Sequence, residues 1–145
     1  MELSCKIEYA LLALIELTGR YEQQEPLQIK YIASLQKIPD RYLEQLLATL
    51  RRGGLLVSHR GAKGGYMLAK EPWKIKLMDV IDCLQGTETQ SVKKDMVVPT
   101  AESSVIQEVW QELEYSIKEV LERYTLQDLR DRRDSKKQLN FMYYI

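Results

Sequence analysis

A glycine-rich segment between two short apolar runs most restricts the fold that this 145-residue chain can adopt. The segment HRGAKGGYML, residues 59–68, carries three glycines and two cations between LLVS and YMLA. Glycine adopts positive φ without steric cost, and short apolar runs joined by such a loop are typical of a β-hairpin. The sequence therefore predicts one hairpin. Its loop has three candidate roles: a phosphate cradle, a plain turn, or a contact with a polyanion.

Apolar residues recur at helical spacing on both sides of this hairpin. The helical patterns cover residues 4–20, 26–38, 40–54, 72–86 and 103–124. Gly53 is placed to cap the third helix, and Ser104 with Gln107 resembles a capping box at the start of the longest one. Thr125 and Asp128 predict a cap for a further helix before the aromatic tail FMYYI. The chain is thus predicted to be mainly α with one small β-hairpin.

Charge and pattern divide the chain into parts. Residues 1–70 carry 10 Lys/Arg against 7 Asp/Glu, whereas residues 71–145 carry 11 against 14. Six of the cations, against two acids, lie between Lys37 and Lys63. Residues 87–100 show no sustained period, which predicts a flexible loop. We expect a first domain at 1–86, this loop, and a C-terminal segment at 101–145.

The sequence matches none of the catalytic or metal-binding motifs considered. The glycine-rich segment lacks the order of glycine, lysine and hydroxyl residue that a nucleotide phosphate loop requires. Catalysis through a triad would need His59, the only histidine, which lies in a predicted strand. Cys5 and Cys83 are 78 positions apart and form no local ligand set. We expect no enzyme activity, no metal and no cofactor.

The compartment is predicted from what the sequence does not contain. No apolar run approaches the ~20 residues of a membrane span, and no secretory h-region precedes the first helix. The two cysteines show no pairing pattern. We therefore expect a cytoplasmic protein with free thiols and no membrane partner.

The third helix and the hairpin have a joint interpretation. The helix places Leu43, Leu46, Leu47 and Leu50 on one stripe and long polar side chains on the other face. That polar face fits a DNA major groove, although taken alone it is typical of a solvated helix. A winged helix-turn-helix accounts for both features, because the helix would read the major groove while Arg60 on the wing reaches the minor groove. The predicted phosphate-contacting cations are Lys37, Arg51, Arg52 and Lys63.

Residues 42–68, YLEQLLATLRRGGLLVSHRGAKGGYML, resemble the Rrf-two family of bacterial transcription regulators. The resemblance extends from IEYALLAL to YTLQDL and FMYYI, and the ending is most similar to the CymR-like branch, which lacks cluster-binding cysteines. It implies a winged helix-turn-helix homodimer on a pseudo-palindromic operator in double-stranded DNA. The matching base-reading positions are Arg41, Glu44 and Gln45, with Arg60 in the minor groove. Iron-sulfur members carry three cysteines in the loop at 87–100, where this chain has none, so Glu8, at a position where some members supply a ligand, is interpreted as a surface acid.

The longest helical pattern predicts the dimer interface. Its broad apolar stripe follows the compact part of the chain and needs a second surface to cover it. The predicted interface residues are Ile106, Val109, Trp110, Leu113, Ile117, Val120 and Leu121. The chain end has two interpretations: its aromatic residues fold back onto the dimer, or Tyr144 and Ile145 insert into O-acetylserine sulfhydrylase, a partner that the resemblance to the CymR-like branch implies.

Three functions from different classes follow. The favoured one is a DNA-binding regulator, with repression favoured over activation, that responds to sulfur and cysteine status or to redox state. The second is an iron-sulfur sensor whose ligands, Cys5 and Cys83, come together between subunits. The third is a protein-interaction module without DNA affinity, in which the hairpin is only a turn and the long helix a docking surface.

Overall fold

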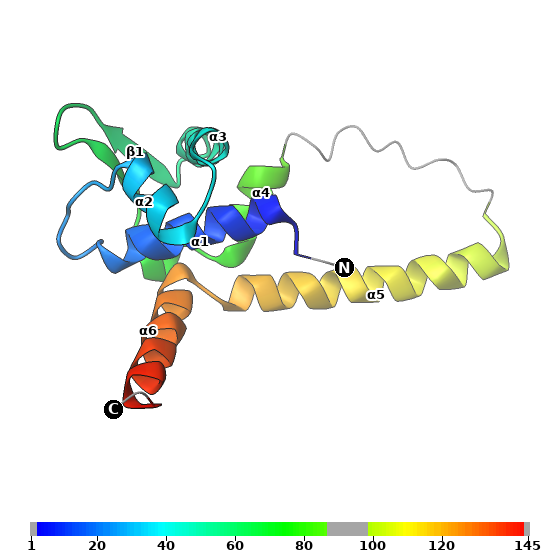
Figure 1. The fold of residues 1–145 in the computed structure, drawn as a ribbon. Helices are drawn as coiled ribbons and strands as arrows, with labels where there is room; N and C mark the ends of the chain where they lie inside the picture. Colours follow the sequence, from blue (N-terminus) through cyan, green and yellow to red (C-terminus); the bar gives the residue numbers. More distant parts are fainter. Residues whose placement is uncertain (1–2, 87–98, 144–145) are drawn as a thin grey trace.

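Short helices around a leucine-rich core form the N-terminal part of the molecule, and a long helix extends away from it (Figure 1). The computed structural model describes residues 3–86 and 99–143. Its elements are α1 (Cys5–Gly19), α2 (Ile29–Gln36), α3 (Asp40–Arg52), β1 (Leu56–His59), β2 (Gly65–Leu68), η1 (Pro72–Lys74), α4 (Leu77–Gln85), α5 (Ala101–Arg123) and α6 (Leu126–Tyr143). The predicted fold class, mainly α with a two-stranded hairpin, is confirmed.

The core collects one face of each N-terminal helix. Ser4 caps α1 by accepting from the Ile7 amide at 3.3 Å, and α1 packs against α2 and α3. The predicted stripe of α3 is buried throughout. The fully buried side chains of the core include Leu14, Ile32, Leu43, Leu47, Leu50, Leu56, Ile75, Val80 and Leu84.

The hairpin is tied to the chain before α2. Its strands pair antiparallel, with Leu56 opposite Leu68 and His59 opposite Gly65. Leu27 and Tyr66 then exchange backbone hydrogen bonds of 3.0 and 2.8 Å, which add a bridge that the sequence did not reveal. A Cβ at Gly65 would overlap the Leu27 backbone, so this glycine is required by contacts within the chain.

The C-terminal helices differ from the sequence prediction in their limits. α5 begins earlier than expected, because Thr100 and Ser103 form its capping box; the prediction of Ser104 with Gln107 was wrong. The predicted cap at Thr125 is confirmed, since its amide donates to Asp128 Oδ2 at 2.9 Å. α6 then continues to Tyr143 and includes most of the segment interpreted as a tail.

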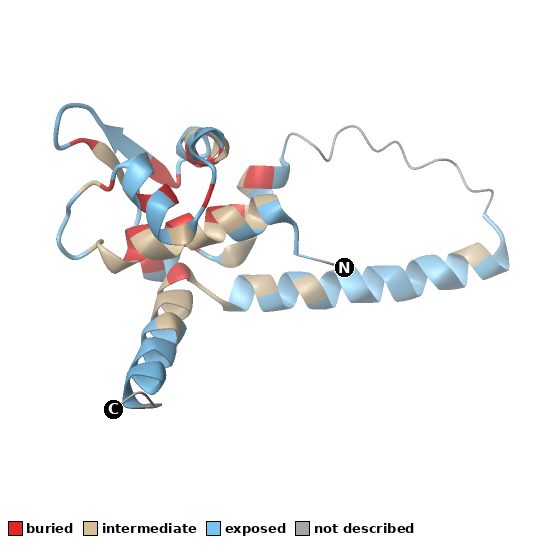
Figure 2. Cartoon of the chain, in the orientation of Figure 1, coloured by how far each residue is buried: buried red, intermediate tan, exposed pale blue. Residues whose placement is uncertain are grey.

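α6 packs on the N-terminal core, whereas α5 does not enter it. Leu126, the first residue of α6, is completely buried in the core, and α6 lies against α1 and η1. No residue of α5 is buried, as the pale blue of most of the helix in Figure 2 shows. Within the described residues no helix combines the length and apolarity that a membrane crossing requires. The predicted loop at 87–100, up to residue 98, and the chain end at 144–145 lie outside the described residues.

Candidate nucleic-acid interface

The exposed face of α3 carries the residues predicted to read bases. Arg41, Glu44 and Gln45 are all exposed, on the side of the helix opposite its buried leucines. The orientation of these side chains is defined because the leucines on the other face of the helix are buried in the core. Thr49 reinforces the last turns by donating to the Gln45 carbonyl at 3.0 Å and accepting from Arg52 at 3.3 Å. α3 therefore presents a rigid polar ridge to solvent.

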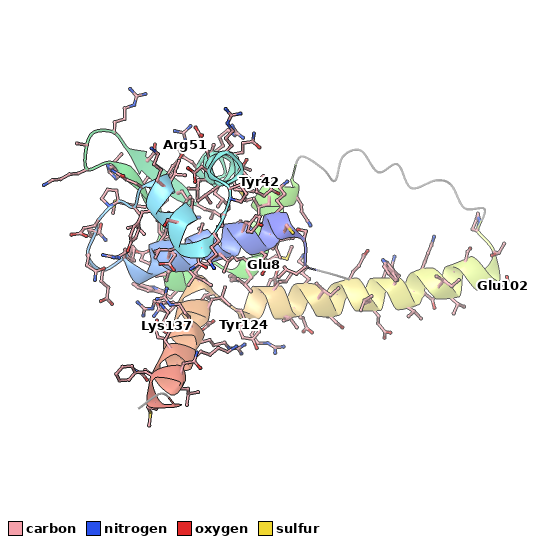
Figure 3. The ribbon with its side chains drawn as sticks, in the orientation of Figure 1. Glu8, Tyr42, Arg51, Glu102, Tyr124 and Lys137 are labelled. Atoms are coloured by element: carbon pink, nitrogen blue, oxygen red, sulfur yellow. The ribbon has the colours of Figure 1, made fainter. Side chains whose placement is uncertain are left out.

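The wing lies beside the end of α3. Arg51 Nη1 donates to Ser58 Oγ on β1 at 3.3 Å, and Figure 3 shows Arg51 at the junction of the helix and the hairpin. Arg60 and Lys63 are exposed in the loop that joins the strands. The Arg51 bond therefore links the polar ridge of α3 to the hairpin that carries these two cations.

Lys37 occupies the turn between α2 and α3. It is exposed and adopts the left-handed conformation, with φ 54°, which ends α2 and redirects the chain into α3. The eight predicted DNA-binding residues thus lie on the α2–α3 turn, on α3 and in the wing, and each is exposed. That they contact DNA stays a prediction.

Two further residues near the wing gave no pattern in the sequence. Arg20, at the end of α1, donates from Nη2 to the Tyr31 hydroxyl at 3.2 Å, and its guanidinium lies 5.9 Å from the ring centroid. Both line a groove that also includes Lys63. Because the pair spans two helices, no local motif identifies it. An arginine at the end of one predicted helix and a tyrosine within the next were the only available signal.

The two thiols lie in different environments. Cys5 is exposed at the first residue of α1, and Cys83 is half-buried on α4. Cys83 Sγ donates to the Thr49 carbonyl at 3.5 Å, close to the C-terminal end of α3. Burial raises the pKa of the Cys83 thiol, and the positive charge of Arg52 opposes this increase. Cys83 is therefore held mainly as a neutral packing residue.

Comparisons with known proteins agree with this architecture. A family model described as Rrf2 (the Rrf-two family), iron-dependent transcriptional regulator, matches residues 3–132. The HTH-type transcriptional regulator CymR of Bacillus subtilis is 36% identical over 145 residues, 100% of both chains. A putative HTH-type transcriptional regulator of Synechocystis is 36% identical over 129 residues, 89% of this chain and 87% of that protein.

Solved structures match equally well. IscR of T. potens superposes with a TM-score of 0.76 at 38% identity, covering 92% of this chain and 88% of that one. CymR (YrzC), described as the global cysteine regulator of B. subtilis, superposes with a TM-score of 0.76 at 36% identity, covering 91% and 98%. These comparisons confirm the predicted winged-helix fold. They also confirm that the chain is not an enzyme, because its relatives are transcriptional regulators.

The iron dependence in the family's description does not fit the residues of this chain. Cys83 is engaged with the end of α3, Cys5 lies at the exposed start of α1, and Glu8 is exposed on α1 (Figure 3). Among residues 3–86 and 99–143 no three His, Cys, Asp or Glu side chains come together as ligands. The sequence of 87–98 contains no cysteine. Within a single chain, residues 3–86 and 99–143 therefore supply no iron-sulfur ligand set.

Proposed function

Because this chain belongs to the Rrf2 family of transcriptional regulators, we propose that it binds a pseudo-palindromic operator as a homodimer and acts as a repressor. The observation that carries the proposal is the bond of Arg51 to Ser58, which joins the polar ridge of α3 to the wing. A recognition helix and a wing held together in this way can read adjacent major and minor grooves. The exposed cations on both elements supply the phosphate attraction that DNA binding requires.

The two elements have different roles in this proposal. Glu44 reads sequence, because its carboxylate repels phosphates and gains only by accepting a hydrogen bond from a cytosine amino group. Arg41 and Gln45 are its neighbours on the same face of α3. Arg60 senses the narrow, electronegative minor groove of A·T-rich sequence. Lys37, Arg51, Arg52 and Lys63 contribute contacts to the phosphate backbone.

The dimer forms through α5. The helix has 23 residues, none of them buried, and its apolar side chains include Ile106 at 67% and Trp110 at 56% exposure. Such a stripe is rare on a monomer, and a two-fold axis lets the same stripe cover itself. The interface consists of Ile106, Val109, Trp110, Leu113, Ile117, Val120 and Leu121. A palindromic operator is the DNA counterpart of this symmetry.

Sulfur and cysteine status, or redox state, is the proposed signal. Support comes from the relatives: one solved structure is described as a global cysteine regulator and another as an oxidized form of Staphylococcus aureus CymR. In this proposal the C-terminal Tyr144 and Ile145 insert into O-acetylserine sulfhydrylase, which couples operator affinity to cysteine synthesis. Terminal carboxylates are captured by backbone donors in a recurrent binding mode.

Selection of bound duplexes from a random DNA pool, followed by binding measurements on variants, tests the DNA-binding function. Glu44→Ala is expected to change the base preference at one or two positions, with a cost of about 1–3 kcal/mol on the preferred sequence. Arg60→Ala is expected to weaken binding and to relax the preference for A·T pairs. Equal losses on all sequences for both variants would contradict these roles. A wild-type protein that selects no duplex and is not retained on heparin would be a protein-interaction module instead.

A further inference from the structure

A groove of about 650 Å³ lies between the wing and the connection from α1 to α2. Arg20 and Tyr31 contribute from α1 and α2, and Lys63 contributes from the wing loop. Glu25 is the one acidic residue that lines it. The groove therefore has cations from two separate segments of the chain, one of which belongs to the wing.

The cation at the end of α1 is held in place. The Tyr31 hydroxyl accepts a hydrogen bond from Arg20 Nη2 at 3.2 Å, and the ring lies under the guanidinium at 5.9 Å. A guanidinium fixed in this way loses less side-chain freedom when it binds an anion, and its planar set of donors suits a phosphate. Tyr31 thus acts as a positioning residue for Arg20.

The width of the groove is also fixed. Gln28 Nε2 donates to the Ala62 carbonyl in the wing loop at 3.2 Å, which ties the wing to the start of α2. The backbone bonds between Leu27, the residue before Gln28, and Tyr66 on β2 also tie this segment to the hairpin. Gln28 is the N-cap of α2, and its side chain makes no cap bond to the helix. The N-terminal dipole of α2 adds positive potential to that of the two cations.

A second hollow continues the groove past Gln28. It is lined by Lys30 from α2 and by His59 and Gly61 from the wing, and it shares Gln28 and Gly64 with the first. A polyanionic strand that follows the base of the wing would pass both hollows in succession. This continuity favours a strand of linked phosphates over a single free anion, which would need donors on several sides at one point.

We propose that this groove holds a phosphodiester of the DNA strand that borders the minor groove entered by the wing. Arg20 and Lys63 are its cations, and Tyr31 positions Arg20. The inference rests on the proposed function and extends the DNA interface to the end of α1, outside the residues that the sequence predicts to bind DNA. It also gives the wing a defined attachment point, since Gln28, which lines the groove together with Lys63, is bonded to the wing loop.

The test uses a fluorescent duplex selected by the wild-type protein and a series of potassium chloride concentrations. Arg20→Ala is expected to bind about five- to tenfold more weakly at ~0.1 M salt, equally on every sequence, with a salt slope shallower by about 0.9. Tyr31→Phe keeps the ring and all charges, so its affinity falls by a smaller factor while its slope stays that of the wild type. Arg132→Ala is the matched control, because Arg132 also stacks on a tyrosine and bonds its hydroxyl, but on α6.

Neutral methylphosphonates, placed singly along the selected duplex, locate the phosphate. The wild type is expected to lose affinity at one position beside the wing site, and Arg20→Ala, which keeps Lys63, is expected to show a smaller difference between the neutral and the charged duplex there. Lys63→Ala repeats the measurement with the cation that the wing contributes to the groove. A folding defect in one of the two variants therefore does not decide the outcome. Circular dichroism compares the folding of each variant with the wild type.

Three results would overturn the inference. Unchanged salt slopes for both Arg20→Ala and Lys63→Ala, with wild-type DNA binding intact, would remove the groove from the DNA interface. Saturable binding of inorganic phosphate, lost in Arg20→Ala while the DNA slope is unaffected, would assign the groove to a free anion. Failure of the wild type to select any duplex would remove the proposed function itself, and the inference with it.

Discussion

Replacing Gly53 with alanine probes the contact between α4 and the end of α3. A Cβ at Gly53 would overlap Cys83 Sγ and would lie 3.4 Å from Cys83 Cβ. The backbone at Gly53 has φ −77° and ψ −1°, which alanine adopts without strain. The thiol is therefore the obstacle, and it cannot rotate away without losing its 3.5 Å contact with the Thr49 carbonyl.

Two opposing effects determine how much Gly53→Ala changes the free energy of unfolding. Overpacking a tight contact costs about 1–3 kcal/mol, whereas replacing glycine by alanine at a compatible conformation stabilises by about 0.4–1 kcal/mol through the unfolded chain. Gly53→Ala should therefore lower the free energy of unfolding by about 1 kcal/mol in the wild type. In a Cys83→Ala background the thiol is absent. There, Gly53→Ala should raise the free energy of unfolding by about 0.4–1 kcal/mol.

Urea unfolding of the four proteins, followed by circular dichroism, measures this double-mutant cycle. Gly54→Ala is the control, because Gly54 has φ +83° with no atom near its Cβ, so it should destabilise equally with and without Cys83. A Gly53→Ala effect of the same sign and size in both backgrounds would refute the reasoning. It would show that α4 is not packed against the end of α3 through this thiol.

Three further predictions concern the dimer, the thiol and the chain end. Leu113→Asp should weaken dimerisation by more than about a thousandfold in sedimentation experiments, because an unpaired buried carboxylate costs about 3–5 kcal/mol in each subunit; a persisting dimer would place α5 elsewhere. Burial raises the pKa of Cys83, so the stability linked to its neutral form is present below the ordinary thiol pKa of ~8.5 and is lost as pH rises through the folded-state value. The urea midpoint should therefore fall above about pH 8.5, and Cys83→Ala should remove the part of this fall that comes from ionisation of the thiol. An unchanged profile of urea midpoint against pH would contradict this. Deleting Tyr144 and Ile145 should abolish calorimetric binding to O-acetylserine sulfhydrylase, and retained binding would leave them without that role.

Local sequence patterns were sufficient to predict the helices that bury a clear apolar stripe. The leucines of α3 specify both the helix and its orientation, and Gly86 ends α4 as expected. The start of α5 was misplaced because Ser104 with Gln107 matches the capping-box pattern, whereas Thr100 has Ser103 instead of Glu or Gln three residues later. In the structure, the reciprocal hydrogen bonds between the amide of each residue and the hydroxyl of the other select Thr100 with Ser103.

Contacts between distant segments could not be predicted from the sequence. Gly64 and Gly65 predicted a hairpin loop, but the sequence did not show that both positions are crowded by the chain itself, at the His59 carbonyl and the Leu27 backbone. The pair of Arg20 and Tyr31 is equally hidden, because an arginine and a tyrosine 11 residues apart form no motif. Sequence periodicity predicts which face of an element is buried, but not which other element meets it.

The junction between α5 and α6 determines how the dimer would present its two α3 helices. Leu77 donates to the Tyr124 carbonyl and Leu126 donates to the Ile75 carbonyl, each at 3.0 Å, so the chain between the two helices is bonded to the start of α4. α6 is then held on α1 by the contact of Arg133 with Glu16 at 3.9 Å.

Glu16 extends this connection to the helix-turn-helix, because it also accepts a hydrogen bond from Gln36 of α2 at 2.7 Å. Since α2 is followed directly by the turn at Lys37 and by α3, a change in the angle between two α5 helices would move α3 with it. A signal that alters the dimer need not reach the DNA-binding face. In the proposed dimer it would change the distance between the two recognition helices, and a palindromic operator tolerates only the spacing that matches its half-sites.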